Sequence, residues 1–435
     1  MSNFETRLVP LVKNLRSQRV NLPDYLSQLE AHFAAQEPQI QAFLPEAGRF
    51  ERLRNEASEL AQRYPHPTVR PPLYGVPVGI KDIFHVDGFP TQAGSRLPAA
   101  VLAGAQAASV TRLKQAGTLL LGKTVTTEFA YFAPGPTHNP HNLAHTPGGS
   151  SSGSAAGVAA GLCPLALGTQ TIGSIIRPAA FCGVVGFKPS FGRVSTRGVI
   201  PLAPSLDHVG FFTQDVAGAA LAASILIENW RGKRLPSRQP VLGVPIGPYL
   251  HQAGTEGLAH FENVQEKLTQ AGFELRRVAA MPDFDQIAAR LKALMAAEAA
   301  QVHQAWFQQY GELYRPPTIE LITRGQKVSS AEIEAGRAGQ LQLRQGLTAL
   351  MAEYGVDLWL APAAVGPAPL TLDSTGDPIM NLPWTYAGLP VITLPAGLAS
   401  NGLPLGLQII AGWQEDEILL AWAGQIATGL AASLV

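Results

Sequence analysis

Two glycine- and serine-rich segments, residues 146–154 and 168–178, carry the groups most able to do chemistry in this chain. Both segments adjoin apolar stretches, which would hold them rigid. Such loops can supply converging backbone N–H donors and a serine hydroxyl, a combination that suits a carbonyl group becoming an oxyanion. They could also be flexible linkers or a nest for an anion. Neither segment contains a base that could activate a serine, and a Gly-x-Ser-x-Gly elbow with a clear His/Asp pair is not evident.

A third segment, residues 117–124, matches the phosphate-loop pattern Gly-x-x-x-x-Gly-Lys-Thr. A phosphate-binding loop follows a strand and wraps the phosphate with flexible backbone N–H groups. Here residues 107–116 are predicted to be helical, and the leucines at 119–121 favour burial. We therefore expect Gly117 to end that helix, and a nucleotide-binding module stays as an alternative from another functional class.

Three histidines and a cysteine suggest further chemistry. His138, His141 and His145 could bind zinc, but a zinc site needs a fixed frame and a further ligand. Their loop is rich in Pro and Asn and holds no Asp, Glu or Cys, so we expect hydrogen-bonded or solvated histidines and no metal. Cys182 could be a nucleophile, but the apolar run at 181–187 predicts a buried, inert thiol.

The overall composition restricts the class of protein. The 435 residues include 32 Lys+Arg and 32 Asp+Glu, so the formal net charge is zero. This balance argues against nucleic acid or an anionic membrane as a partner. The sequence shows neither an apolar signal segment nor a stretch of about 18 apolar residues, and its two cysteines fit a reducing compartment. We expect a soluble, cytoplasmic protein, with 46% hydrophobic residues to form a core.

The fold predicted from the hydrophobic pattern is of the α/β class. Continuous apolar segments bounded by glycines alternate with helical segments, as a sheet covered by helices on both faces requires. We therefore expect a large mixed, mostly parallel central sheet. Its predicted strands cover residues 75–81, 118–121, 164–167, 241–244, 273–278, 357–360, 391–394 and 405–410. The second glycine/serine loop leaves the strand at 164–168 at its C-terminal end, where open α/β sheets place ligands.

Two helical regions flank or interrupt this pattern. Residues 1–70 are predicted to form an N-terminal helical segment that packs on the core, and residues 71–435 a single α/β domain. Between about 283 and 352 the period is helical only, which predicts a helical insertion, a common place for substrate selection. Ser329 and Glu332 form a capping box that opens the last helix of this insertion.

The glycine/serine-rich segment from Gly148 to Ser174 and Pro178 resembles the signature of the amidase signature family. The other landmarks of that family are present along the chain in their fixed order. They are residues 75–82, 121–124, 127–130, 181–189, 205–210, Asn381, 388–390 and 402–408. The likeness covers roughly residues 70–215 and 357–412, and it implies the large α/β fold of that family.

The resemblance also implies a catalytic unit, the Ser–cis-Ser–Lys triad. The matching residues are Lys81, Ser150 and Ser174, with a cis peptide between Gly149 and Ser150. Ser174 would attack the amide carbonyl, and its proton would pass through Ser150 to a neutral Lys81. Burial can lower a lysine pKa enough for this role. The backbone N–H groups of the oxyanion hole would be those of Thr171, Ile172, Gly173 and Ser174.

The chain departs from the commonest family pattern at three positions of the second loop. Gln170 replaces an Asp, Ile172 replaces a Gly, and Ile176 replaces an Arg, with Arg177 one place later. This version resembles a malonamidase-like branch, in which the arginine holds a substrate carboxylate. Alternatively, Arg177 packs against Gln170 or a carbonyl. Ile172 must keep negative φ, or the hole is altered, because a β-branched residue does not take positive φ cheaply.

These features predict an amidase that hydrolyses a small carboxamide, which can bear a carboxylate, to a carboxylic acid and ammonia or an amine. The partner expected is a small-molecule amide, with no metal or organic cofactor; assembly as a homodimer stays open. One alternative is the A subunit of a glutamine-dependent tRNA amidotransferase, against which the neutral charge argues. Another is a catalytically inactive amidase-like protein.

Overall fold

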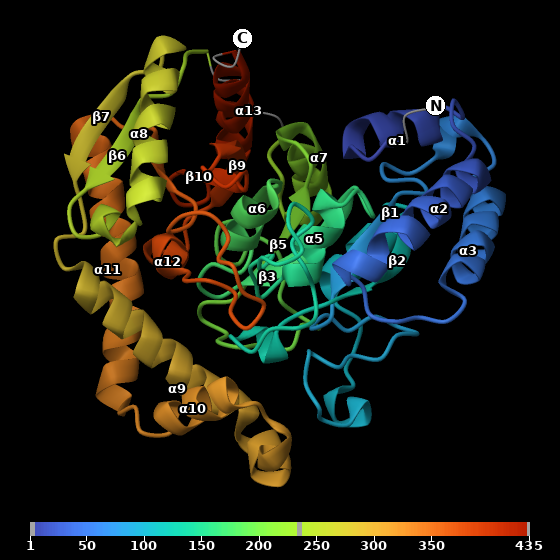
Figure 1. Cartoon of the computed structure of the whole chain (residues 1–435), viewed down its shortest axis with the longest axis horizontal. Coiled ribbons are helices and arrows are strands. Elements are labelled where there is room, and N and C mark those ends of the chain that lie inside the picture. The colour runs from blue at the N-terminus through green and yellow to red at the C-terminus, as the bar shows by residue number, and fades with distance from the viewer. Residues whose placement is uncertain (1–4, 233–236, 433–435) are drawn as a thin grey trace.

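The computed structural model describes residues 5–232 and 237–432. Within them 10 strands form one sheet in the order β2-β1-β3-β5-β4-β9-β10-β8-β6-β7 (Figure 1). The strands are β1 (Pro77–Lys81), β2 (Leu119–Thr124), β3 (Leu165–Gln170), β4 (Val185–Lys188), β5 (His208–Thr213), β6 (Leu242–Ile246), β7 (Leu275–Ala279), β8 (Leu358–Pro362), β9 (Val391–Leu398) and β10 (Pro404–Ile410). The predicted α/β fold with a large mixed sheet is confirmed.

The strand pairs at the two ends of the sheet are parallel, and those in the middle are antiparallel. Strand β1 pairs in parallel with β2 and β3, and β6 with β7 and β8. The pairs from β3 through β5, β4, β9 and β10 to β8 are antiparallel. Parallel pairing is therefore less extensive than predicted, because β9, β10 and the two buried strands that the sequence did not predict, β4 and β5, form only antiparallel pairs.

Helices flank this sheet. They are α1 (Leu8–Arg16), α2 (Leu22–Ile40), α3 (Arg49–Arg63), α4 (Ala108–Gln115), α5 (Ser152–Ala159), α6 (Ile176–Cys182), α7 (Val216–Leu226), α8 (Thr255–Gln270), α12 (Leu382–Tyr386) and α13 (Asp416–Ala432). Helix α5 contacts β1 and β3, and α6 contacts β9 and β10. Helices α1–α3 lie at the β2 end of the molecule, opposite α8 and β7 (Figure 1). The division of the chain at residue 70 stays a prediction.

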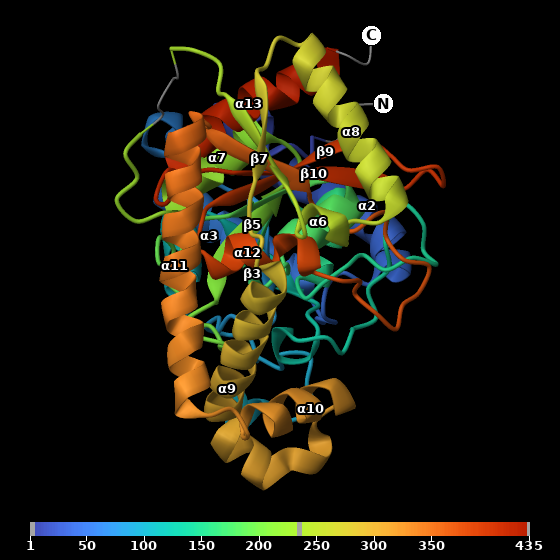
Figure 2. The ribbon, with the colours of Figure 1, turned by 90° about the vertical axis from the view of Figure 1, so that its left-hand side faces the viewer.

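Three further helices extend beyond the sheet, α9 (Phe284–Tyr310), α10 (Pro316–Gly325) and α11 (Ser330–Tyr354). Helices α9 and α11 run side by side, and α10 packs on α9 near the far end of this arm (Figures 1 and 2). The predicted capping box is present, because Ser329 accepts from the Glu332 N–H and Glu332 accepts from the Ser329 N–H. We call α9–α11 the helical arm.

A buried glutamate ties the helical arm to the sheet. Glu128 follows β2, and its carboxylate accepts hydrogen bonds from the backbone N–H of Arg315, at 3.0 Å, and from the hydroxyl of Thr318, at 2.5 Å. Both donors lie at the start of α10. The carboxylate therefore supplies acceptors for groups at the N-terminus of a helix, which also favours negative charge.

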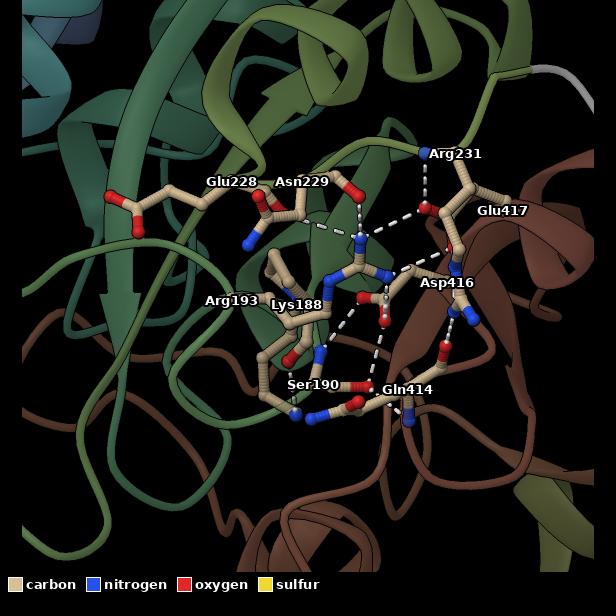
Figure 3. Close-up of polar contacts among 10 residues, drawn as sticks. Lys188, Ser190, Arg193, Glu228, Asn229, Arg231, Gln414, Asp416 and Glu417 are labelled. Atoms are coloured by element: carbon tan, nitrogen blue, oxygen red, sulfur yellow. Dashed lines mark hydrogen bonds and ion pairs between the residues drawn. The ribbon is translucent and has the colours of Figure 1, made fainter.

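A buried ion-pair cluster joins the C-terminal helix to the loop after β4 (Figure 3). Arg193 donates to Asp416 at 3.2 Å and to Glu417 at 2.8 Å. Asp416 also accepts from the backbone N–H and the hydroxyl of Ser190, each at 2.8 Å. The two carboxylates begin α13, so the cluster fixes the start of that helix.

In the part of the chain that the structure describes, no helix combines the length and apolar character needed to cross a bilayer.

Candidate active site

Lys81 is the last residue of β1, and its side chain is fully buried. Its Nζ lies 2.7 Å from Oγ of Ser150 and 2.9 Å from Oγ1 of Thr169. Burial lowers the pKa of Lys81 well below its ordinary value, and the charge of Asp207 offsets this only in part. The surroundings therefore favour the uncharged amine, the form that can accept a proton.

Ser150 lies in the first glycine/serine loop, directly before α5. The peptide between Gly149 and Ser150 is cis, as predicted. A Cβ atom added at Gly149 would lie 2.7 Å from the side chain of Thr375, so the loop fits only without a side chain there. The Ser150 carbonyl accepts from the Thr127 N–H at 3.2 Å. These contacts hold Ser150 between β2 and the segment around Thr375.

The second loop follows β3 and presents four free backbone donors. The N–H groups of residues 171–174 donate to no group within the described residues. Gln170 holds the loop in place, because its Oε1 accepts from the N–H groups of Ile175 and Ile176 at 2.8 and 3.0 Å. On the other side, the Thr385 hydroxyl donates to the Ile172 carbonyl at 2.6 Å. We call residues 171–174, the predicted donors of an oxyanion hole, the oxyanion loop. Contacts of Gln170 and of the Ile172 carbonyl fix this loop, and its four N–H groups stay available.

Gly173 lies where a side chain would not fit. A Cβ added there would be 2.3 Å from Oδ1 of Asn381. Asn381 is itself held by a bond from its Nδ2 to the Ala363 carbonyl at 2.8 Å. Glycine at this position therefore lets the backbone of the oxyanion loop approach a fixed polar group closely.

Ser174 ends the free part of the oxyanion loop and is 8% exposed. Its hydroxyl forms no hydrogen bond with any described residue, that of Ser150 included. The two loops are nevertheless in contact, because Arg177, three residues after Ser174, donates to the Gly149 carbonyl at 2.7 Å. The structure thus joins Lys81 to Ser150 by a hydrogen bond and brings the loop of Ser174 close to them, with no hydrogen bond between the two serine hydroxyls.

Asp207 fixes the start of the oxyanion loop. It is buried, and its Oδ1 accepts from the Thr171 hydroxyl at 2.6 Å. Its Oδ2 accepts from the backbone N–H groups of Leu202 and Ala203 at 2.8 and 3.0 Å. Burial raises the pKa of Asp207 to about 6, although these hydrogen bonds lower it. Asp207 therefore positions Thr171 and also places negative charge near Lys81.

Arg177 is buried and bonds to the protein itself. Its Nη2 donates to the Gly149 carbonyl and, at 3.1 Å, to the Thr375 hydroxyl, and its Nη1 donates to the Gly376 carbonyl. Its Nε has no partner among the described residues. Burial lowers the pKa of Arg177 to about 9. Packing against a carbonyl, one of the two alternatives for this residue, is therefore what the structure contains.

Ile172 does not disturb the backbone of the oxyanion loop. It is not among the described residues with positive φ, so the loop adopts the first of the two predicted arrangements. Its side chain lines a pocket of about 460 Å³. The remaining lining residues are Tyr131, Phe132, Lys292, Met295, Arg324, Ser374, Gly376, Asp377, Pro378, Ile379 and Leu382.

In the structure, neither the 117–124 segment nor Cys182 forms a reactive or ligand-binding site. Residues 119–124 are the buried strand β2, Gly117 has φ +88° just after α4, and Lys123 pairs with buried Asp82 at 2.7 Å. This is not a phosphate-binding loop. Cys182 is a buried free thiol, and burial raises its pKa.

The three loop histidines each contact a backbone carbonyl. His138 lies 2.7 Å from the Leu143 carbonyl, and His141 lies 2.9 Å from that of Cys182. His145 lies 2.8 Å from the carbonyl of Ala368. The described part of the chain holds no group of three or more metal-binding side chains. These histidines are the hydrogen-bonded ones expected from the sequence.

Sequence reasoning missed Thr169 and Asp207 as parts of the site. Thr169 lies near the C-terminal end of β3, and Lys81 lies at the C-terminal end of the neighbouring parallel strand β1. A polar residue at that place on the adjacent strand was an available signal. The only sequence signal for Asp207 was its place within the landmark at residues 205–210, because its partner Thr171 is far from it in sequence.

Comparisons with known proteins show which chains this one is similar to. The family model described as Amidase matches residues 32–420. The chain is 32% identical to AtzE, the 1-carboxybiuret hydrolase subunit of Pseudomonas sp. (strain ADP), over 98% of this chain and 99% of that protein. It is 33% identical to the A subunit of the glutamyl-tRNA(Gln) amidotransferase of Prochlorococcus marinus (strain MIT 9303), over 94% of each. A solved amidase structure superposes with a TM-score of 0.87 at 31% identity, covering 97% of this chain and 99% of that one.

Proposed function

The chain belongs to the amidase signature family of amide-hydrolysing enzymes, and we propose that it hydrolyses a small carboxamide through an acyl-enzyme on Ser174. The observation that carries this proposal is the buried contact of 2.7 Å between Lys81 Nζ and Ser150 Oγ, beside four unpaired backbone donors. A neutral amine, a bridging hydroxyl and an anion-binding loop are the parts that acyl transfer requires.

In the proposed first step Ser174 Oγ attacks the amide carbonyl carbon. The Ser174 proton passes to Ser150 Oγ while the Ser150 proton passes to Lys81 Nζ, which becomes the ammonium. The N–H groups of the oxyanion loop bind the negative oxygen of the tetrahedral intermediate. Hydrogen bonds of such a relay often close only when substrate is bound, which accords with the unpaired hydroxyl of Ser174.

The intermediate then expels the nitrogen. The C–N bond breaks, and the proton held by Lys81 returns through Ser150 to the leaving group, which departs as ammonia or an amine. Water attacks the acyl-enzyme, and its proton follows the same route to Lys81. Collapse of the second intermediate returns that proton to Ser174 and releases the carboxylic acid.

The test is ammonia release by the purified protein over a panel of small amides. Ser174→Ala and Lys81→Ala should each lose at least about 10³-fold in kcat/KM, and a fluorophosphonate should label Ser174. Ser58→Ala and Lys13→Ala, at exposed positions of α3 and α1, are matched controls. Full activity of Ser174→Ala, or labelling of Cys182 instead, would contradict the proposal.

A second candidate is favoured by the identity to the Prochlorococcus marinus amidotransferase chain. In that case glutamine would be the amide, and ammonia would pass to a partner protein. The formal net charge of zero gives tRNA no net electrostatic attraction to this chain. Glutaminase activity that appears only with a co-purified partner would favour this candidate; hydrolysis by the isolated chain favours a free-standing amidase.

The remaining expectations belong to the proposal. The two cysteines are free, which fits a reducing compartment such as the cytoplasm. Nη1 and Nη2 of Arg177 already donate to the Gly376 and Gly149 carbonyls. We therefore propose that Arg177 contributes to substrate binding indirectly, by holding these two backbone segments in place. The assembly state, including a homodimer, is open to measurement by light scattering.

A further inference from the structure

The pocket beside the oxyanion loop adjoins the candidate active site. Ile172 belongs to both, and the carbonyl of Gly376, another lining residue, accepts from Arg177. Its volume of about 460 Å³ lies within the range of sites that enclose small molecules. A substrate whose carbonyl oxygen reaches the oxyanion loop would extend its remaining atoms into this pocket.

The walls of the pocket come from three parts of the chain. The segment after β2 contributes Tyr131 and Phe132, and residues 374–382 contribute the wall that touches Arg177. The helical arm contributes Lys292 and Met295 from α9 and Arg324 from α10. The arm therefore forms one wall of the pocket; its helices α9 and α10 lie below the sheet in Figure 2.

The charges that line the pocket are unbalanced. Lys292 and Arg324 are exposed to it, and neither forms an ion pair with a carboxylate of the described residues. Asp377 is the acidic residue of the lining, and its Oδ1 accepts from the Ile379 N–H at 2.9 Å. Two cations thus face one carboxylate that is already engaged by its own loop.

Neighbouring groups do not neutralise this excess. Burial raises the pKa of Tyr131, and Arg324 lowers it, so the Arg324 guanidinium lies near the Tyr131 hydroxyl. Glu320, one turn earlier on α10, also acts on Tyr131, but it does not line the pocket and has no ion pair with Arg324 among the described contacts. An anionic ligand would therefore find two cations without carboxylate partners.

Arg177 is less suited to that task. Its Nη1 and Nη2 already donate to the Gly376 and Gly149 carbonyls and to the Thr375 hydroxyl. Binding a carboxylate there would require breaking these bonds and leaving buried carbonyls unpaired, which is costly. Lys292 and Arg324 hold no buried carbonyl of the described residues, and the neighbour of Arg324 is the Tyr131 hydroxyl, so binding an anion there leaves no buried carbonyl unpaired.

We propose that Lys292 and Arg324 bind a carboxylate of the substrate, and that the substrates are monoamides of dicarboxylic acids. The apolar residues Ile172, Ile379 and Leu382 also line the pocket, so the spacer between the two carbonyl carbons is aliphatic. This inference rests on the proposed function and specifies its substrate class.

The test compares monoamides of three- to six-carbon dicarboxylic acids with neutral aliphatic amides of the same length, by ammonia release. For the best chain length the acid should have a KM at least about 10-fold below that of its neutral counterpart. Lys292→Met with Arg324→Gln should raise KM for the acid about 5- to 10-fold and leave KM for the neutral amide within twofold, since each exposed ionic contact contributes modestly. Asp377→Asn should lower KM for the acid.

Matched controls separate charge at the pocket from charge in general. Lys13→Met with Arg19→Gln removes the same two charge types from exposed positions 13 and 19 and should leave both KM values unchanged. Raised ionic strength should weaken the preference for the acid. Equal KM values for acid and neutral amide, or an unchanged acid KM in the pocket variant, would overturn the inference.

Binding of glutarate, measured by calorimetry, tests the same site without turnover. Weaker binding to the pocket variant than to wild type supports the carboxylate site, and equal binding overturns it. Absence of hydrolysis of every amide together with no labelling of Ser174 would instead contradict the proposed function, so the two failures are distinguishable.

Discussion

The Nζ atom of Lys81 lies 2.7 Å from the Oγ atom of Ser150, at the C-terminal end of β1. The neighbouring strand β3 runs parallel to β1, so it ends at the same edge of the sheet. Thr169, near that end, gives Lys81 its second hydrogen bond, and the oxyanion loop follows directly. Parallel pairing of these two strands is therefore what brings the Lys81 amine from one strand to the loops that carry both serines.

Burial of Lys81 should make the stability of the protein depend on pH. Its pKa in the folded state is far below the ordinary value of 10.5, so between the two values the unfolded chain binds more protons, and the free energy of unfolding falls as pH falls. Lys81→Met has no such proton. Chemical denaturation at pH values from about 10 down to about 7 should show wild type losing stability relative to Lys81→Met.

Lys13→Met provides the control for that experiment, because position 13 is exposed on α1. Its stability should follow that of wild type at every pH. A constant difference between wild type and Lys81→Met over this range would show that Lys81 is protonated to the same extent in both states.

The hydrogen bond from Thr171 to Asp207, 2.6 Å long, should position the oxyanion loop. Thr171→Val and Asp207→Asn should each lower kcat about 10- to 100-fold with a smaller change in KM, because a displaced donor loses transition-state stabilisation. The losses in the double variant should be less than additive, since both changes affect the Thr171–Asp207 hydrogen bond, although Asp207→Asn also removes the charge near Lys81. Additive losses would mean that the two residues act independently.

The cluster at the start of α13 should resist mild acid. Burial raises the pKa of Glu417, but hydrogen bonds from Arg193 and Arg231 outweigh burial and lower the pKa to about 2. The stabilisation is present above the ordinary value of 4.5 and is lost as pH falls from there toward 2. Glu417→Gln should lower the free energy of unfolding at pH 7 by roughly 2–4 kcal/mol, measured by urea denaturation.

The difference between Glu417→Gln and wild type should shrink as pH is lowered, because protonated Glu417 resembles Gln. Glu415→Gln is the matched control, since the Glu415 carboxylate makes no ion pair among the described residues. An equal effect of both substitutions would contradict a specific role for the cluster.

The sequence predicted the outer strands of the sheet well and its middle less well. Strands such as β1, β3 and β8 are continuous apolar runs bounded by turn residues, so their pattern alone indicates them. Strand β4 has only 4 residues, and β5 begins with His208 and ends with Thr213. Their antiparallel pairing is fixed by tertiary contacts, which no local pattern reports.

The residues of the candidate site also divide into those that the sequence predicts and those that it does not. Lys81, Ser150 and Ser174 could be predicted because each lies in a recognisable motif, and the cis peptide before Ser150 was confirmed. The two cations of the pocket, Lys292 and Arg324, could not be predicted, because they lie on different helices of an arm that contains no motif. Only the packing of α10 on α9 brings them to one wall.

Glu128 should position the arm and, through it, the substrate pocket. Its carboxylate accepts from Arg315 and Thr318 at the start of α10, and Arg324 lies near the end of the same helix. Glu128→Ala should free α10 and raise KM about 3- to 10-fold with kcat little changed, since losing a helix cap costs about 1 kcal/mol. Glu128→Gln keeps an acceptor for the Thr318 hydroxyl and should be intermediate. Hydrogen exchange of the amides of α10 should accelerate in Glu128→Ala, and protection equal to wild type alongside a raised KM would place the effect elsewhere.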